Sequence, residues 1–474
     1  MIPTHPHPGG GDALDAVGLR HVVAVLSTVQ IVSWGVLYYA FAALQSSIAT
    51  DTGWSSVAIT GAFSLSQIVA GGVGIWVGRH IDAFGPRRVM TAASVVAMPG
   101  VASMALAPNL AMFYLGWALV GVAMAGTLYP PAFAALTHWG GTQRVRALTT
   151  LTLVAGLAST VFAPLASLLE DLVGWRGAYL ILLAGLVLIT VPLHWWGLDH
   201  PWGTTDHAGA QGTPTPSAGP STAQAAAAVR SRPFVLLATA NALTALAVFA
   251  VVINLVPMLV EQGMSRNLAA VALGLGGVGQ VVGRLGYARF AAATSVTVRS
   301  VVVLAAVAVA TAALALAPPS AGVLIVLGMV LGLARGVYTL IQATAVTDRW
   351  GPTAYGTVNG ILTAPALAAA AVAPFVGAAL AQVMRSYADA FLVLAAVAGL
   401  AAALMVGATP NDRRPRRALT RSRAPSQSCA EAAVAPRSGR SSSSSDEMCA
   451  SMSSRTRRTT SRSAPAGSAT SQST

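Results

Sequence analysis

The segment Gly276 to Arg284 reads GGVGQVVGR and places an arginine inside an apolar stretch of the chain. A similar segment, VGIWVGR, runs from Val73 to Arg79, so the pattern V-G-x-x-V-G-R occurs twice, 205 positions apart (278 minus 73). A guanidinium in hydrocarbon costs roughly 2.5–3.5 kcal/mol at the centre of a helix, so such an arginine usually faces water or a ligand. The repeat indicates a duplicated half, and its second arginine is a candidate site residue.

The composition is that of an integral membrane protein. Hydrophobic residues make up 55% of the 474 positions and charged residues 9%, against about 25% charged residues in a soluble domain. Residues 411–474 hold 12 of the 28 arginines and four acids, so most of the net charge of +13 lies there. The rest of the chain is mildly basic, and we expect no nucleic-acid partner. Both cysteines, Cys429 and Cys449, lie in the same tail, so no disulfide framework or metal site is expected.

Apolar runs of about 20 residues predict twelve transmembrane helices. The first six predicted spans are 21–44, 57–77, 89–107, 110–135, 147–169 and 177–198, and the second six are 233–257, 267–288, 298–317, 321–346, 355–380 and 388–408. The two sets are nearly equal in length, which together with the repeated motif predicts an all-α membrane protein of two six-helix halves. The expected parts are an N-terminal segment (1–20), the first half (21–198), a Gly/Pro/Ser/Thr-rich linker (199–232), the second half (233–409) and a disordered basic tail (410–474).

Arginines are distributed unevenly between the predicted loops. The basic loops are the second–third, fourth–fifth, sixth–seventh and eighth–ninth connections, which carry Arg79, Arg87, Arg88, Arg144, Arg146, Arg230, Arg232, Arg289 and Arg299. The alternate loops hold most of the acids. Because positive loops stay in the cytoplasm, both termini and the linker are expected on the cytoplasmic side.

The loop after the second predicted span, Gly78 to Arg88, reads GRHIDAFGPRR. It resembles the G-x-x-x-D-R-x-G-R-R signature of the major facilitator superfamily and stands where that family carries it. In the family this loop is a conformational latch, so the resemblance assigns that role to Gly78, Asp82, Gly85, Arg87 and Arg88. Ala83 and Pro86 replace basic residues of the signature, which implies a weaker latch. An ordinary basic turn is the alternative.

Three further stretches narrow the resemblance. Residues 53–74, 138–156 and 174–180 look like the branch that contains monocarboxylate porters and oxalate/formate-type exchangers, and with helices 8 and 10 the likeness covers 21–409. Trp117 stands where the family has an arginine. Of the G-x-x-x-G-P pattern that antiporters of the family carry in the fifth span, only Ala163-Pro164 is present in the predicted span 147–169. The resemblance implies the major facilitator fold and secondary active transport.

Arg284 is the first substrate-binding candidate. In the resembled branch an arginine on helix 8 binds the substrate carboxylate, and a guanidinium suits that role because it pairs with a carboxylate through two parallel hydrogen bonds. The alternative is that Arg284 mirrors Arg79 and reaches the interface. Gln280 lies one turn before it on the same face, where many such porters place an acid, and a glutamine cannot carry a proton.

Arg335 is the second candidate, because it lies too deep in the tenth span to reach water easily. Arg335, Tyr338 and Gln342 fall at i, i+3 and i+7 and form one polar stripe on an apolar helix. The alternative is a structural arginine that caps carbonyls near glycines of the same helix.

The first span contributes a third stripe. Gln30, Trp34 and Tyr38 follow at i, i+4 and i+8 and are expected to line a central cavity, with packing as the alternative. Asn359 of the eleventh span is a weaker binding candidate, with a backbone partner as the alternative.

No energy source is evident in the sequence. The chain has no lysine and hence no ATP-binding G-x-x-x-x-G-K-[ST] loop, and no acid lies within the predicted spans. We expect no catalytic residue, metal or cofactor.

The arginines and the resemblance together predict a transporter of a small, monocarboxylate-like organic anion, with a proton as possible partner. We expect it to be a functional monomer in a bacterial inner membrane. The alternatives are a major facilitator exporter of neutral or amphiphilic compounds and a non-transporting membrane receptor or partner protein.

Overall fold

The computed structural model describes residues 14–202, 229–350 and 355–408, and every regular element in these ranges is a helix. The expected tail (410–474) lies outside the described residues, as do most of the expected linker and of the N-terminal segment. The first elements are α1 (Ala16–Trp34), the π-helix η1 (Gly35–Tyr39), α2 (Ala40–Thr52), α3 (Ser56–Phe84), α4 (Pro86–Ala105), α5 (Leu110–Thr127), α6 (Tyr129–Trp139), the short 3₁₀-helix η2 (Gly141–Gln143), α7 (Arg144–Ala155) and α8 (Ala158–Gly197). They are followed by α10 (Arg232–Glu261), α11 (Arg266–Ala293), α12 (Val296–Leu316), α13 (Ala321–Thr344), α14 (Thr347–Trp350), α15 (Tyr355–Met384) and α16 (Tyr387–Val406).

Eleven helical stretches of the described residues are long and apolar enough to cross a membrane. The longest, Gly141–Gly197, has 57 residues and contains two of the predicted spans. At Gly174 its backbone leaves the helical region, with φ 70° and ψ 168°. Glycine adopts this positive φ without strain because it has no Cβ, and the two spans meet there. The fold is the all-helical membrane fold that the hydropathy pattern predicts.

The helices begin at short polar residues that satisfy free backbone N–H groups. Asp15 accepts from Gly18 N at 2.8 Å at the start of α1, and Asn109 accepts from Met112 N at 3.0 Å at the start of α5. Serines do the same before α3, α10, α11, α12 and α16. Such caps stabilise a helix end by about 1 kcal/mol each.

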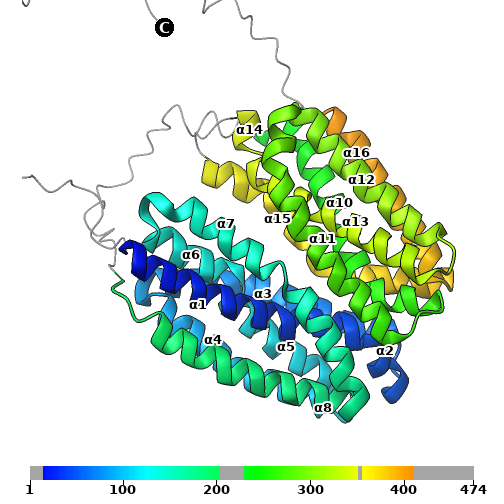
Figure 1. Ribbon diagram of the computed structural model, residues 1–474, viewed down its shortest axis with the longest axis horizontal. Coiled ribbons are helices and arrows are strands. Elements are labelled where there is room, and N and C mark those ends of the chain that lie inside the picture. The colour runs from blue at the N-terminus through cyan, green and yellow to red at the C-terminus, as the bar shows by residue number, and fades with distance from the viewer. Residues whose placement is uncertain (1–13, 203–228, 351–354, 409–474) are drawn as a thin grey trace, which may run out of the picture. The chain divides into compact units, whose positions relative to one another are not determined.

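The helices pack into two bundles (Figure 1). In the first bundle α4 packs on α5 and α8, α3 packs on α5, and α1 packs on α7 and α8. In the second bundle α11 packs on α13, α12 on α16, and α10 on α15 and α16. The principal contacts between the bundles are those of α8 with α11, α3 with α15 and α2 with α10.

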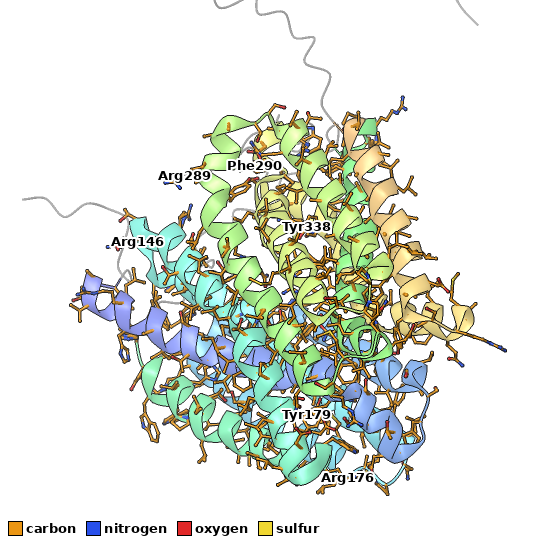
Figure 2. The ribbon with its side chains drawn as sticks, turned by 45° about the vertical axis from the view of Figure 1, so that its right-hand side comes forward. Arg146, Arg176, Tyr179, Arg289, Phe290 and Tyr338 are labelled. Carbon is orange, nitrogen blue, oxygen red and sulfur yellow. The ribbon has the colours of Figure 1, made fainter. Side chains whose placement is uncertain are left out.

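The two ends of the bundles differ in their polar residues. We call the end where α8 stops and α10 starts the linker side, and the opposite end, where α2 and α10 stop, the far side. Figure 2 shows Arg146 and Arg289 toward the linker side and Arg176 at the far side. Arg176 forms an ion pair with Asp51 of α2, whereas Arg146 is exposed.

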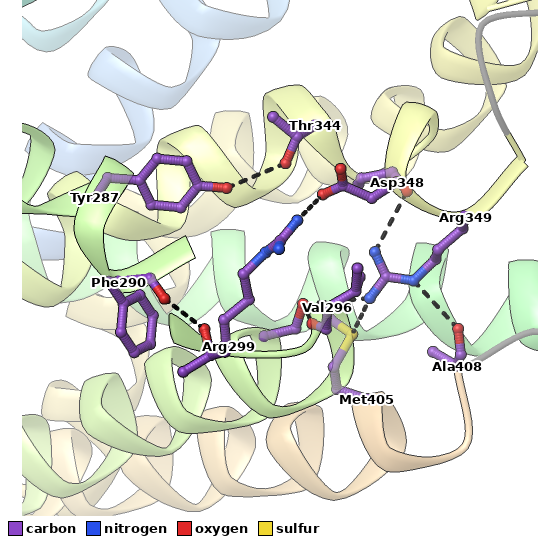
Figure 3. Close-up of polar contacts among 12 residues, drawn as sticks. Tyr287, Phe290, Val296, Arg299, Thr344, Asp348, Arg349, Met405 and Ala408 are labelled. Carbon is purple, nitrogen blue, oxygen red and sulfur yellow. Dashed lines mark hydrogen bonds and ion pairs between the residues drawn. The ribbon is translucent and has the colours of Figure 1, made fainter. Parts of the chain in front are cut away.

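A polar cluster fastens the linker side of the second bundle (Figure 3). Arg299 of α12 forms an ion pair with Asp348 of α14. Arg349 donates to the carbonyl of Ala408 at 3.3 Å and to Ser300 Oγ at 3.2 Å. Burial, with the nearby Arg299, lowers the pKa of Arg349 to about 10, while Asp348 acts in the opposite direction, so this guanidinium stays charged at neutral pH. The cluster ties α12, α14 and the end of α16 together.

Glycines bring α11 and α13 into close contact. A Cβ built on Gly332 would lie 2.0 Å from the carbonyl oxygen of Gly276, and one on Gly336 would lie 2.2 Å from that of Gln280. Side chains larger than hydrogen cannot occupy such positions without moving the helices apart. This approach places Gln280 of α11 beside Arg335 of α13.

Several helices run past their predicted ends. The stretch that begins with α1 continues to Thr52 instead of ending at 44, and α8 continues beyond 169. Acids that hydropathy places between spans, such as Asp51 and Glu170, therefore lie on helices. The expectation that acids stand outside the helices is wrong for these two positions, because the end of an apolar run marks the edge of the hydrocarbon and not the end of the helix.

Candidate functional site

A cavity of about 100 Å³ lies between the two bundles. Both bundles contribute to its walls. Its lining residues are Trp34, Tyr38, Tyr39, Tyr129, Ala155 and Gly156 from the first bundle and Val248, Phe249, Gln280, Arg284, Arg335, Tyr338, Thr339 and Gln342 from the second. Seven of the nine substrate-binding candidates from the sequence meet here, although they come from α1, η1, α11 and α13.

Arg335 crosses the cavity from α13 to the first bundle. Its Nη2 atom donates to the Tyr39 hydroxyl at 2.8 Å and to Gln280 Oε1 at 2.7 Å. Both acceptors are neutral, and no ion pair to Arg335 is found within the described residues. The guanidinium charge is thus hydrogen-bonded and lacks an acidic partner.

Arg284 also joins the bundles. Its Nη1 atom donates to the carbonyl of Thr152 in α7. Its Nε atom is buried and has no hydrogen-bond partner in the part of the chain that the structure describes. Leaving a buried donor unpaired costs about 1–3 kcal/mol, and more when the group is charged. Arg284 therefore lines the cavity and carries one buried donor without a partner among the described residues.

Aromatic rings form the wall that the first bundle contributes. Trp34 lies 5.0 Å from Tyr129 and 5.3 Å from Tyr38, measured between ring centroids, and Tyr38 lies 5.2 Å from Tyr39. We call these four residues the aromatic wall. Ring pairs at these distances stabilise one another by about 0.5–1.5 kcal/mol each, and the wall lines the same cavity as the two arginines.

Tyr338 and Gln342 are both at the cavity, as the stripe on the tenth span predicts. The Tyr338 hydroxyl donates to the carbonyl of Asn241 at 3.0 Å and accepts from Gln342 Nε2 at 2.7 Å. Figure 2 shows Tyr338 in the interior of the second bundle. Its hydroxyl is therefore already paired, and Gln342 is the more available polar group of the two.

Gln30 and Asn359 do not line the cavity. Gln30 is fully buried, donates to the carbonyl of Thr127 at 2.7 Å and accepts from Trp34 Nε1 at 3.1 Å. It therefore orients Trp34, which does line the cavity. Asn359 lies on α15, and its buried Oδ1 atom has no partner among the described residues.

Tyr39 is the main lining residue that the sequence pattern missed. The π-helix η1 widens the turn between Trp34 and Ala40, so Tyr38 and its neighbour both face the cavity. An α-helical stripe of every fourth residue includes Tyr38 and omits Tyr39. Thr339 and Phe249 were missed as well, because neither breaks the apolar pattern of its helix.

The loop expected to be a latch contacts its own bundle. Arg87 forms an ion pair with Asp199, donates from Nε to the carbonyl of Trp195 at 2.6 Å and lies over the ring of Trp195, 4.5 Å from its centroid. These partners lie at the end of α8 and just beyond it, so within the described residues Arg87 does not reach the second bundle.

The other latch candidates have simpler surroundings. Gly85 has φ 77° and forms the turn between α3 and α4, a conformation that favours glycine. The backbone carbonyl of Asp82 accepts from Trp202 Nε1 at 3.3 Å. Gly78 and Arg88 are exposed. No group of three or more potential metal-binding side chains occurs among the residues that the structure describes.

Sequence comparison identifies a family that covers most of the chain. A sequence model of the Major Facilitator Superfamily matches residues 26–320 and 293–444. Transcription regulatory protein OpdE of Pseudomonas aeruginosa is 33% identical over 159 residues, which are 32% of this chain and 38% of that protein. Monocarboxylate transporter 11 of Mus musculus is 29% identical over 205 residues, 43% of each chain. The matched region thus spans about two fifths of the length of these curated relatives.

Solved structures share the fold at low sequence identity. A bacterial homolog of the human lysosomal transporter Spinster, in an inward-facing and occupied conformation, has a TM-score of 0.66 and 15% identity over 83% of this chain and 97% of that chain. The nucleoside transporter NupG has a TM-score of 0.61 and 14% identity over 82% of this chain and 98% of that chain.

Proposed function

The chain belongs to the major facilitator superfamily and is a multi-pass membrane transporter rather than an enzyme, and on this premise we propose that it carries a small organic anion, monocarboxylate-like, by alternating access. The site would be the cavity between the two bundles. Arg284 and Arg335 would bind the anion, with Gln280, Tyr338 and Gln342 as polar neighbours and Trp34 and Tyr38 as part of the wall. Gln30 would orient Trp34, and Asn359 has no place in this site.

The observation that carries the proposal is the pair of guanidinium groups that have no acidic partner in the described part of the chain. Arg284 has an unpaired Nε atom, and Arg335 is held only by a phenol and an amide. A positive charge away from bulk water is costly unless an opposite charge compensates it. A bound carboxylate supplies that charge and pairs with planar N–H donors. A cation or a neutral amphiphile leaves both charges uncompensated.

The volume of the cavity limits the size of the cargo. About 100 Å³ is well below the roughly 300–1,000 Å³ of sites for drug-sized molecules. It accommodates an anion of a few non-hydrogen atoms. The aromatic wall would contact the apolar part of such an anion while the arginines hold its carboxylate. This argues against the alternative of an amphiphile exporter in the conformation that the structure describes.

The relatives give further support of unequal weight. Monocarboxylate transporter 11 agrees with an anionic cargo by its name, although the match covers less than half of it. The name of OpdE keeps the receptor or partner alternative in view. The linker-side arginines support an orientation with both termini in the cytoplasm, and the proposed location is a bacterial inner membrane. The protein would act as a monomer whose two bundles, the six-helix halves, rock about the cavity. The loop around Arg87 would serve as a latch in another conformation.

Uptake into proteoliposomes tests the proposal. The full-length protein is reconstituted and offered radiolabelled acetate, lactate and pyruvate, with lactamide and uridine as uncharged probes. We expect uptake of at least one carboxylate and of neither uncharged probe. Arg284→Gln and Arg335→Gln should each reduce that uptake by at least about tenfold, the effect of losing one charge-assisted hydrogen bond.

Arg79→Gln is the matched control, because Arg79 ends the first copy of the repeated motif and is exposed. It should transport like the wild type. Equal uptake by all three variants contradicts the site assignment. Uptake of uridine or lactamide in place of a carboxylate favours the exporter alternative, and no uptake of any probe by a well-folded protein favours the receptor alternative.

A further inference from the structure

Glu170 differs from the other acids of the described chain. It lies on α8, is 8% exposed, and is the one acidic side chain among the buried polar residues of the described ranges. Its Oε1 atom accepts from Arg266 Nη1 of α11 at 2.6 Å and from the hydroxyl of Ser47 in α2. Arg266 Nη1 also donates to Ser47 Oγ at 3.1 Å. An ion pair thus joins the first bundle to the second.

The two oxygens of the Glu170 carboxylate have different surroundings. Oε1 accepts both hydrogen bonds, whereas Oε2 is buried and has no partner within the described residues. A buried acceptor without a partner is costly while it carries charge. Protonation removes that charge, and Oε2 is the free position for the proton.

The other charged groups near Glu170 are already engaged or face water. Asp171 accepts from Asn267 of α11. Asp51 of α2 pairs with Arg176, on the same bundle. The side chain of Arg266 is 43% exposed, so water solvates it when the pair breaks. Releasing Arg266 therefore costs less than releasing a buried cation.

The pair stands where the bundles touch. The Ser167 hydroxyl of α8 donates to Asn267 Oδ1 at 2.5 Å, and about two turns deeper Thr160 Oγ1 donates to the carbonyl of Gly274 at 2.8 Å. These contacts between α8 and α11 join the two bundles toward the far side. Of the ion pairs found in the described ranges, Glu170–Arg266 is the one that joins the two bundles.

We propose that Glu170 is a proton-binding site, separate from the anion cavity, whose protonation releases Arg266 and opens the far side. That this proton is coupled to movement of the anion rests on the proposed transport function. A proton from the far-side solution binds Oε2, the ion pair with Arg266 is lost, and the two bundles separate at that end. Closing again requires that the proton leave, so that Glu170 recovers its charge. Anion and proton moving together would carry no net charge.

A distance measurement tests this without any substrate, so its outcome is independent of the cargo. The full-length chain, with Cys429→Ser and Cys449→Ser, carries spin labels at Leu172→Cys on α8 and Val383→Cys on α15. Both side chains are exposed, at 70% and 80%. Distances are recorded by pulsed electron resonance in lipid nanodiscs as the pH is lowered stepwise from neutral into the acidic range.

In the otherwise wild-type protein the distance should shift to longer values as the pH falls. Glu170→Gln and Arg266→Gln should show the longer distance at every pH, and Glu170→Asp should keep the pH response. Asp51→Asn is the matched control, because it removes a far-side ion pair within one bundle. It should also keep the response.

Two results overturn the proposal. One is a wild-type distance that does not change with pH, and the other is a pH response that persists in Glu170→Gln. Size-exclusion profiles of each variant show whether it is folded. If Glu170→Gln does not fold, Arg266→Gln decides, since an unchanged short distance in that variant shows that the pair does not hold the far side closed. If the wild-type protein shows the pH-dependent distance but takes up no carboxylate, the result contradicts the proposed anion transport and leaves the role of Glu170 supported.

Discussion

Replacing Gly336 by alanine should push α13 away from α11. The added Cβ would lie 2.2 Å from the carbonyl oxygen of Gln280, whereas ordinary contacts begin at 3.4 Å, so the helices must part by about 1.2 Å. Overpacking of this kind costs about 1–3 kcal/mol. The helix propensity of alanine offsets about 1 kcal/mol of this.

The same displacement affects the site. Gly336 follows Arg335, and the Arg335–Gln280 hydrogen bond is 2.7 Å long. A movement of about 1.2 Å along that bond lengthens it to about 3.9 Å, outside the range of a hydrogen bond. Gly336→Ala should therefore lower the thermal unfolding midpoint and break the hydrogen bond between Arg335 and Gln280.

Gly286→Ala is the control, because a Cβ at Gly286 of α11 meets nothing within 4 Å. Thermal unfolding of the full-length protein in detergent, followed by tryptophan fluorescence, compares both variants with the wild type. We expect a midpoint a few °C lower for Gly336→Ala and an equal or higher midpoint for Gly286→Ala. Equal midpoints for the two variants would refute the close approach of α11 and α13.

Three further substitutions probe the contacts of the arginines. Tyr39→Phe removes an acceptor that an anion must displace from Arg335, so carboxylate uptake should half-saturate at roughly tenfold lower concentration, and an unchanged value argues against competition. Gln280→Glu places a carboxylate beside Arg335 and compensates its charge, so uptake should fall at least about tenfold, while unchanged uptake contradicts this reason. Asp199→Asn breaks an exposed ion pair with Arg87 and should lower the free energy of unfolding by at most about 1 kcal/mol, so a large loss of uptake in this variant points to a latch role.

Hydropathy was sufficient to predict the helical membrane fold, because runs such as 298–317 have 20 residues, or about 30 Å of helix, which matches the thickness of the hydrocarbon. It was not sufficient for the helix ends. α8 continues beyond 169 to include Glu170, since polar residues beyond the hydrocarbon keep the helical conformation when a partner such as Arg266 is available. Sequence spacing alone gives no sign of that partner, which lies 96 positions away.

The cavity was partly predictable for a related reason. Arg284 and Arg335 stand out because charge in an apolar run is rare, and both line the cavity. Gln30 has the same helical spacing as Trp34, but its amide is used by the carbonyl of Thr127. Which polar groups are already paired depends on a neighbouring helix, and periodicity within one helix carries no information about it.

The π-helix Gly35–Tyr39 divides the first membrane crossing into two α-helical pieces that are out of phase. One extra residue in a turn rotates the next helical piece by about 100° relative to a continuous α-helix. The α-helical piece before the π-helix holds Gln30, and the piece after it directs Ser47 toward Glu170. Deleting one residue within the π-helix would restore one continuous α-helical periodicity and turn Ser47 away from the bundle interface. Alignment of this crossing with an unbroken helix therefore needs a one-residue gap at Gly35–Tyr39. A single α-helical periodicity cannot predict both the residues that line the cavity and those that reach the far-side contact.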